Sequence, residues 1–256
     1  MSLFNYYPTR NETDPQKDKK IAKHSLLFSS FLLFCFWLVL IVEKTLDLQF
    51  YRAGIYPLHL KGLPGILLAP FIHAGYKHLL ANSFPFWILC LTLIYFYRKL
   101  GYLIFFLLYL MSGLLLWFCG REAWHIGCSG VIYGMASFLF FSGIFRSDAR
   151  LLTIALIVAF LYGSLFWGLF PLDPSVSWEG HLWGAVSGLF LSLFYRGKGP
   201  RRTHYEWENE DDQNENSGND LPAELTDEKP ETNPLTENSR FPEHKKDKVF
   251  DCPNII

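Results

Sequence analysis

A few polar residues with chemical potential lie inside long apolar stretches of the sequence. They are His78 with Asn82, Ser129, and His181. A serine hydroxyl is a weak nucleophile until an imidazole accepts its proton, which requires the two groups to be roughly 2.6–3.2 Å apart. The same imidazole can later return the proton to a leaving amine. We therefore interpret Ser129 as a candidate nucleophile and His181 as its candidate base.

An attacked carbonyl becomes an oxyanion, and fixed hydrogen-bond donors must stabilise that charge. His78 and Asn82 are four residues apart, so they share one face of a helix and can supply two donors. Backbone N–H groups around Ser129 would lie at a helix N-terminus, which also favours negative charge. Because the three stretches with these groups offer no carboxylate at this level, we predict a Ser–His dyad and not a triad.

The elements that must position these groups are membrane helices. Half of the 256 residues are hydrophobic, and blocks such as 25–42 and 101–118 contain no charged residue. Runs of about 18 or more apolar residues match the hydrocarbon thickness of a bilayer. The sequence predicts an all-α integral membrane bundle of six transmembrane helices, at roughly 25–42, 76–97, 101–118, 129–145, 151–170 and 181–195.

Basic residues predict the orientation of this bundle. Lysines precede the first span, and Lys/Arg clusters follow the second, fourth and sixth spans at 98–99, 146–150 and 196–202. The positive-inside rule then places both termini in the cytoplasm, so the second, fourth and sixth spans all descend from the outer side. The polar sets consequently reach a common depth near the outer surface, where polar groups inside spans are functional candidates. We expect a multi-pass protein of a bacterial inner membrane.

The chain divides into three predicted parts. Residues 1–24 form a basic cytoplasmic segment, and residues 25–196 form the membrane domain. Residues 197–256 are rich in Asp, Glu, Asn and Pro, which predicts a disordered acidic cytoplasmic tail. Residues 43–75 form a long first external connection, too broken by Gly and Pro for a spanning helix, and we expect it to lie partly in the membrane interface.

Glycines indicate how the fourth and sixth spans meet. Gly130 and Gly134 are four residues apart, as are Gly184 and Gly188, and this spacing lets membrane helices approach closely. Such glycines are usually packing devices, and a serine in a membrane helix usually bonds its own backbone. A single histidine is often a helix-end anchor. The joint placement of all these groups favours the dyad. His125 and Cys128 are expected to be exposed at the outer mouth.

Three segments together resemble the rhomboid intramembrane serine proteases over about residues 20–196. The segments are His73-Ala-Gly-Tyr-Lys-His78-Leu-Leu-Ala-Asn82, Gly127-Cys128-Ser129-Gly-Val-Ile-Tyr133-Gly134 and Gly180-His181-Leu-Trp-Gly184-Ala-Val-Ser-Gly188. The resemblance implies Ser129 as nucleophile, His181 as base, and His78 and Asn82 as oxyanion donors beside the Ser129 and Cys128 backbone. It also implies that Tyr133 packs on His181, that His73 supports a hydrated pocket, and that transmembrane segments of other proteins are cleaved near the outer face.

One departure from the family is visible. Many members have a Trp-Arg pair in the first external loop, where this chain has Gly62-Leu-Pro-Gly-Ile66. The alternative is a catalytically inactive relative that binds membrane clients. A transporter that uses its histidines as a proton relay is disfavoured, because the first, third and fifth spans offer almost no polar groups for a path. We expect transmembrane protein substrates and the lipid bilayer as partners, no nucleic acid, and neither cofactor nor metal.

Overall fold

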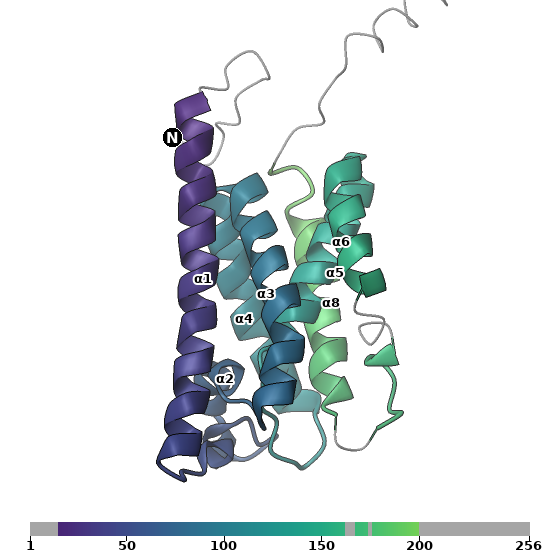
Figure 1. Ribbon diagram of the computed structural model, residues 1–256. Helices are drawn as coiled ribbons and strands as arrows, with labels where there is room; N and C mark the ends of the chain where they lie inside the picture. The colour runs from purple at the N-terminus through teal and green to yellow at the C-terminus, as the bar shows by residue number, and fades with distance from the viewer. Residues whose placement is uncertain (1–14, 162–166, 174–175, 200–256) are drawn as a thin grey trace, which may run out of the picture. The chain divides into compact units, whose positions relative to one another are not determined.

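The computed structural model describes residues 15–161, 167–173 and 176–199, and in these residues every regular element is a helix. Figure 1 shows the long helices side by side. They are α1 (Pro15–Thr45), α3 (Tyr76–Tyr97), α4 (Lys99–Cys119), α5 (Ser129–Arg146), α6 (Ala149–Leu161) and α8 (Trp178–Phe194).

Four of these helices, α1, α3, α4 and α5, are long and apolar enough to cross a membrane. The described part of α6 is apolar but has only 13 residues, and α8 has 17. A span needs about 20 residues. The structure therefore contains an all-helical bundle with four candidate spans, and the crossing of the bilayer by α6 and α8 stays a prediction.

Most predicted helix bounds agree closely with the structure. The second span was predicted at 76–97, where α3 lies, whereas α1 begins at Pro15, ten residues before the predicted start of the first span. The fifth span is wrong at its C-terminal end, because residues 168–170 form a turn and not a helix. Gly168 has little helix propensity, and Pro171 disfavours a helical conformation in the residue before it.

The connection between α1 and α3 consists of short helical turns: η2 (Phe50–Ala53), η3 (Leu60–Gly62), α2 (Gly65–Leu68) and η4 (Ala69–Phe71). Its frequent Gly and Pro residues explain why no long helix forms. Ile55, Ile66 and Ala69 pack against Leu116 of α4 in a small core. Several leucines of this connection are exposed, including Leu58, Leu60 and Leu67. Their insertion into a membrane interface remains a prediction.

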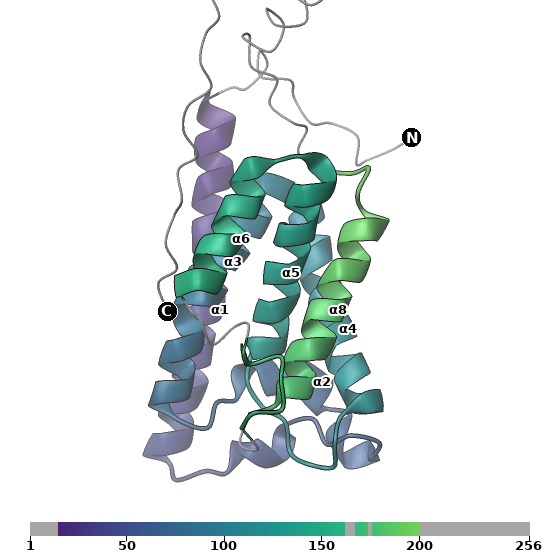
Figure 2. The ribbon, with the colours of Figure 1, turned by 90° about the vertical axis from the view of Figure 1, so that its right-hand side faces the viewer.

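Helices α5 and α8 pack closely through glycines. A Cβ atom added to Gly184 would collide with the carbonyl oxygen of Gly130, and one added to Gly188 would collide with the carbonyl oxygen of Gly134. The Ser137 hydroxyl also donates a hydrogen bond to the Ala185 carbonyl, at 2.7 Å. Small residues thus bring the two backbones together, as the glycine spacing predicts. The N-terminal ends of α3, α5 and α8 lie at the same end of this bundle (Figures 1 and 2).

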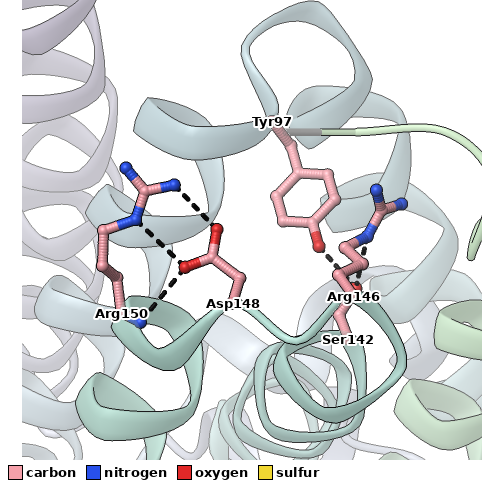
Figure 3. Close-up of polar contacts among 5 residues, drawn as sticks. All are labelled: Tyr97, Ser142, Arg146, Asp148 and Arg150. Carbon is pink, nitrogen blue, oxygen red and sulfur yellow. Dashed lines mark hydrogen bonds and ion pairs between the residues drawn. The ribbon is translucent and has the colours of Figure 1, made fainter. Parts of the chain in front are cut away.

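A polar network closes the opposite end of the bundle (Figure 3). The hydroxyls of Tyr97 on α3 and Ser142 on α5 lie 2.5 Å apart, and Arg146 donates to Ser142 at 3.3 Å. Arg146 also donates to the carbonyl oxygen of Tyr195, at 2.6 Å, just beyond the end of α8. Asp148 accepts two hydrogen bonds from the guanidinium of Arg150 at the start of α6. The network therefore joins α3, α5 and the C-terminal end of α8, with the Asp148–Arg150 pair beside it.

Candidate active site

The polar groups of the predicted site meet at the end where α5 and α8 begin. Ser129 is the first residue of α5, and His181 lies in the first turn of α8. His181 Nε2 is 2.9 Å from Ser129 Oγ, within the range that proton transfer between them requires. His181 is buried, with 8% of its surface exposed. The structure thus brings the two side chains together from helices that are 52 residues apart in sequence.

The hydrogen bonds of His181 specify its neutral tautomer. Its Nδ1 atom is 2.8 Å from the carbonyl oxygen of Gly168. A carbonyl oxygen can only accept, so Nδ1 must carry the proton and donate it. The neutral ring then has a free lone pair on Nε2, which accepts the hydrogen bond from the Ser129 hydroxyl. This is the arrangement that a general base needs before it removes the serine proton.

The phenol ring of Tyr133 stacks on one face of the His181 imidazole. The two ring centroids are 4.2 Å apart, and the ring planes differ by only 10°. Tyr133 lies one helical turn after Ser129 on α5, so a single helix supplies both the hydroxyl partner and the stacking partner of His181. Together with the Gly168 bond, this stacking restricts rotation of the ring.

His78 and Asn82 both approach the backbone of Gly127, two residues before Ser129. A Cβ atom at Gly127 would lie 2.9 Å from His78 Cε1 and 3.9 Å from Asn82 Nδ2. Gly127 also has φ of +106°, a conformation that other residues rarely adopt. Asn82 Nδ2 is buried and has no hydrogen-bond acceptor among the described residues. A buried donor without a partner is costly, and an oxyanion beside Ser129 would supply the missing acceptor.

The hydrogen bonding of His78 makes its other ring nitrogen a donor. Its Nδ1 accepts the backbone N–H of Ala74, at 3.4 Å. In the neutral ring Nε2 therefore carries the proton, and a Cβ atom at Gly127 would lie 3.1 Å from it. His78 and Asn82 thus both have an N–H group near Gly127, and their role as oxyanion donors stays a prediction.

Cys128 differs from expectation, and it contacts His73. The prediction that Cys128 is exposed at the mouth is wrong, because only 1% of its surface is exposed. Its backbone N–H donates to His73 Nε2, at 3.5 Å. Because this N–H already has an acceptor, the role of the Cys128 backbone as an oxyanion donor remains a prediction. Burial lowers the pKa of His73 to about 3, with a further contribution from His78. His73 is consequently neutral and can accept the Cys128 N–H.

Sequence reasoning also missed three features of the site. His125 is buried and not exposed at the mouth. Gly168 was placed inside a predicted helix, although Gly168 followed by Pro171 is a signal for a helix end. Glu179 falls outside the predicted sixth span, 181–195, whereas it lies in the first turn of α8, two residues before His181, and is buried. A carboxylate is therefore near the dyad, but His181 Nδ1 donates its hydrogen bond to the Gly168 carbonyl and not to this carboxylate.

A cleft of about 770 Å³ opens beside the Ser129–His181 pair. One side is formed by His78, Asn82 and Pro85 of α3, and another by residues 167–173. Its volume lies in the range of pockets that bind drug-sized ligands. Both atoms of the predicted reaction are therefore next to a space that can hold a short peptide segment.

The fold and the site define an all-helical, multi-pass membrane protein with a serine–histidine pair at one end of its bundle. The rhomboid domain matches residues 61–198, which is more than half of the chain. The chain belongs to the rhomboid family.

Relatives with known sequences agree with this membership. An uncharacterised protein of Mycobacterium tuberculosis is 34% identical over 167 residues, which cover 60% of this chain and 68% of the relative. An uncharacterised protein of Mycobacterium leprae is 30% identical over 162 residues, covering 60% of this chain and 64% of the relative. A protein of Acanthamoeba polyphaga mimivirus named as a rhomboid protein is 34% identical over 139 residues, covering 52% of this chain and 76% of the relative.

Proposed function

We propose that this protein is an intramembrane serine endopeptidase that cleaves transmembrane segments of other membrane proteins. The observation that carries the proposal is the 2.9 Å contact between Ser129 Oγ and His181 Nε2, with Nδ1 of the same ring donating to Gly168. Membership of the rhomboid family also supports it. A second support is physical: ionisable side chains inside a membrane are costly and usually mark a functional site.

The first half of the reaction forms an acyl-enzyme. His181 Nε2 takes the proton of the Ser129 hydroxyl as the oxygen attacks the substrate carbonyl. The carbonyl oxygen becomes negative, and the N–H groups of His78 and Asn82 stabilise it. When the peptide bond breaks, His181 returns its proton to the leaving amine. The Gly168 carbonyl stabilises the imidazolium that exists between these two transfers, since the protonated ring keeps donating to it.

The second half releases the acyl group by hydrolysis. His181 accepts a proton from a water molecule, whose oxygen attacks the ester carbonyl, and then gives the proton back to Ser129. A cavity of about 30 Å³ adjoins Ser129 and is lined by Tyr109, Ser112 and His125 among others. It is large enough to hold one water molecule with polar partners. This cavity is our candidate for the source of the hydrolytic water.

The substrate must present an extended backbone to Ser129. A helical peptide bond is hidden, because its carbonyl is engaged in the i to i−4 hydrogen-bond ladder. We therefore propose that substrates are transmembrane helices with a locally unstable stretch, which unwinds into the cleft between α3 and residues 167–173. In the proposed topology, six spans with both termini in the cytoplasm, this cleft faces the outer side of the membrane.

The proposal is tested with purified protein in lipid. A fluorophosphonate reacts with an activated serine, so we expect covalent labelling of the wild type at Ser129 and cleavage of a single-span model substrate. Ser129→Ala and His181→Ala should each abolish both activities. Ser192→Ala is the matched control, because Ser192 lies on α8, the helix of His181, and donates to Leu189 within its own helix.

The outcomes separate this proposal from its rival. A wild-type protein that folds but neither labels nor cleaves would support the alternative of an inactive rhomboid-like protein that binds membrane clients. Cleavage that persists in Ser129→Ala would refute Ser129 as nucleophile.

A further inference from the structure

A second polar cluster lies beside the Ser129–His181 pair and makes none of the proton transfers proposed above, although two of its residues, His125 and Ser177, also line the small water cavity. It connects residues 121–125, which lead into α5, with residues 176–179, which open α8. Its side chains belong to Arg121, His125, Ser177 and Glu179. The loop leading to the predicted nucleophile is thus joined directly to the turn that carries the predicted base.

The contact between His125 and Ser177 has a defined direction. His125 Nε2 is 3.1 Å from the Arg121 carbonyl oxygen, which can only accept, so Nε2 carries the ring proton. His125 Nδ1 is then an acceptor, and it receives the Ser177 hydroxyl proton at 2.7 Å. Burial lowers the pKa of His125, which favours this neutral ring. The imidazole therefore bridges two segments.

Ser177 is the N-cap residue of α8, yet its side chain makes no capping hydrogen bond. An N-cap serine ordinarily accepts a backbone N–H from the first turn and so stabilises the helix. Here the hydroxyl is directed to His125 of another segment. The Ser177 side chain thus links the start of α8 to the loop before α5 and does not cap its own helix.

An ion pair runs beside this hydrogen bond. Arg121 Nε is 3.5 Å from Glu179 Oε1, and Arg121 Nη2 donates to the Val176 carbonyl at 2.9 Å. Glu179 has 5% of its surface exposed, and its Oε2 atom has no hydrogen-bond partner among the described residues. A buried carboxylate without a counter-charge is strongly unfavourable, so the position of Glu179 depends on Arg121.

The loop end of the cluster is itself fixed. The backbone N–H of His125 donates to the Ile55 carbonyl at 2.8 Å, and the N–H of Ile55 donates back to the His125 carbonyl at 2.9 Å. Ile55 belongs to the small core of the connection between α1 and α3. The contacts of Arg121 and His125 therefore hold the start of α8 against a fixed support.

We infer that these four side chains form a strap, Arg121–His125–Ser177–Glu179, that sets the distance between Ser129 and His181. The inference rests on the proposed function. His125 is four residues before Ser129, and Ser177 is four residues before His181, so a shift at the strap moves both reacting groups. These are positioning residues, because they act through the dyad and not on the substrate. A misplacement of about 1 Å can cost on the order of a hundredfold in rate.

The hydroxyl link is tested through the second-order rate of fluorophosphonate labelling, which needs an aligned dyad but no bound peptide. Ser177→Ala should lower this rate about tenfold to a hundredfold, with a matching fall in kcat and little change in KM for the model substrate. Ser177→Thr keeps the hydroxyl and should label nearly as fast as the wild type. Ser187→Ala is the control, because Ser187 is a buried serine of α8 that donates to Trp183 in its own helix.

A second pair of variants covers the case in which Ser177→Ala does not fold. His125→Asn keeps an oxygen acceptor near the position of Nδ1, whereas His125→Leu has no acceptor. The strap predicts faster labelling by His125→Asn than by His125→Leu at comparable melting temperatures. Equal labelling rates in the two variants would overturn it.

The ion pair is tested by a double-mutant cycle. Arg121→Gln leaves the buried Glu179 carboxylate unpaired and should slow labelling about tenfold or more. Adding Glu179→Gln removes that charge, so the double variant should recover most of the lost rate. Additive losses in the double variant would contradict the pairing.

These results are distinguishable from failure of the protease proposal. An unlabelled wild type would reject the proposed function. If the wild type is labelled and three variants label equally fast, the strap alone would be rejected. These variants are Ser177→Ala, His125→Leu and Arg121→Gln. The strap would also be rejected if the variants lost labelling rate only in proportion to their fall in melting temperature, as Ser187→Ala does. Such a result would indicate a purely structural role.

Discussion

At the scale of single residues, the state of His181 depends on one backbone carbonyl. In the Ser–His–Asp arrangement a carboxylate holds the histidine in its working tautomer. Here the Gly168 carbonyl accepts from Nδ1, and the Tyr133 ring packs on the imidazole face. A neutral carbonyl stabilises an imidazolium less than a carboxylate does. In the proposed reaction, the remaining stabilisation must come from the predicted oxyanion donors and from alignment.

Asn82 provides the sharpest test of oxyanion stabilisation. Asn82→Ala should lower kcat for a model substrate by roughly tenfold to a thousandfold, with KM little changed, because the lost N–H bonds only to the developing oxyanion. Steady-state kinetics in lipid vesicles measures both constants. Thr92→Ala is the control on the same helix, since the Thr92 hydroxyl donates to Ile88 in its own helix. An unchanged kcat in Asn82→Ala would remove Asn82 from the site.

Gly127 should tolerate no side chain. Gly127→Ala combines a strained positive φ with a methyl group 2.9 Å from His78 Cε1, so we expect loss of labelling by at least tenfold. Gly75→Ala is the matched control: a Cβ atom there has no neighbour within 4 Å. Labelling rates of the two purified variants, compared with that of the wild type, decide the matter. Equal rates would mean that the loop before Ser129 can shift without cost.

At the scale of elements, the glycine contact between α5 and α8 sets how near Ser129 and His181 can come. Gly184→Ala places its methyl group against the rigid carbonyl of Gly130, which must move. Gly130→Ala meets the Gly180 carbonyl at 3.1 Å, a milder contact. We expect both to lower the melting temperature and the labelling rate, with Gly184→Ala clearly the worse, because overpacking costs about 1–3 kcal/mol.

Thermal unfolding in detergent and labelling rates give this ordering. Gly197→Ala serves as the control, since a Cβ atom there has no neighbour within 4 Å. A Gly184→Ala protein as stable as the control would show that the helices do not depend on this close approach.

The sequence predicted the elements better than their ends. Apolar length defined α3, α4 and α5 to within two residues, because lipid-facing helices are apolar on all sides. The turn at Gly168 escaped prediction, since hydrophobicity continues through Leu169 and Phe170 while the backbone leaves the helix. The burial of His125 and Glu179 escaped as well. Each depends on a partner about 50 residues away, Ser177 for one and Arg121 for the other, and no local pattern encodes such pairing.

At the scale of the whole molecule, two polar clusters lie at opposite ends of the helical bundle. The Ser129–His181 pair lies at one end. The network of Tyr97, Ser142 and Arg146, drawn in Figure 3, lies at the other. Arg146 and Arg150 also fall at the boundary that the positive-inside rule assigns to the cytoplasm. Two predictions belong to this scale. One concerns the membrane topology, and the other concerns the contribution of the Asp148–Arg150 ion pair to stability at different pH values.

Cys119 offers a test of the proposed topology. This exposed cysteine ends α4 on the side of the predicted active site, whereas Cys252 lies in the proposed cytoplasmic tail. A membrane-impermeant maleimide added to intact cells should label Cys119, and Cys252 only after permeabilisation. Cys119→Ser and Cys252→Ser variants assign the two signals. The opposite pattern would invert the topology and place the cleft on the cytoplasmic side.

Asp148 should make the stability of the bundle depend on pH in the acidic range. Burial alone raises the pKa of this carboxyl, but the hydrogen bonds and charge of Arg150 outweigh it and hold the pKa below its usual range. A lowered folded-state pKa stabilises the protein above the unfolded value, and this stabilisation is lost as pH falls through the folded value. Asp148→Asn should therefore lower the melting temperature at pH 7, and the difference from wild type should shrink below about pH 4. An equal difference at both pH values would exclude ionisation as its source.

The turn that holds Gly168 has one more consequence. The same short stretch, residues 167–173, borders the cleft and supplies the carbonyl that keeps the proton on Nδ1 of His181. Any displacement of this border, by an arriving peptide or by detergent, must lengthen that bond and let the imidazole exchange tautomers. In the proposed reaction, one piece of backbone thus governs both access to the cleft and the tautomer of His181, so a protein held too widely open would contain every predicted reacting group and still lose its base.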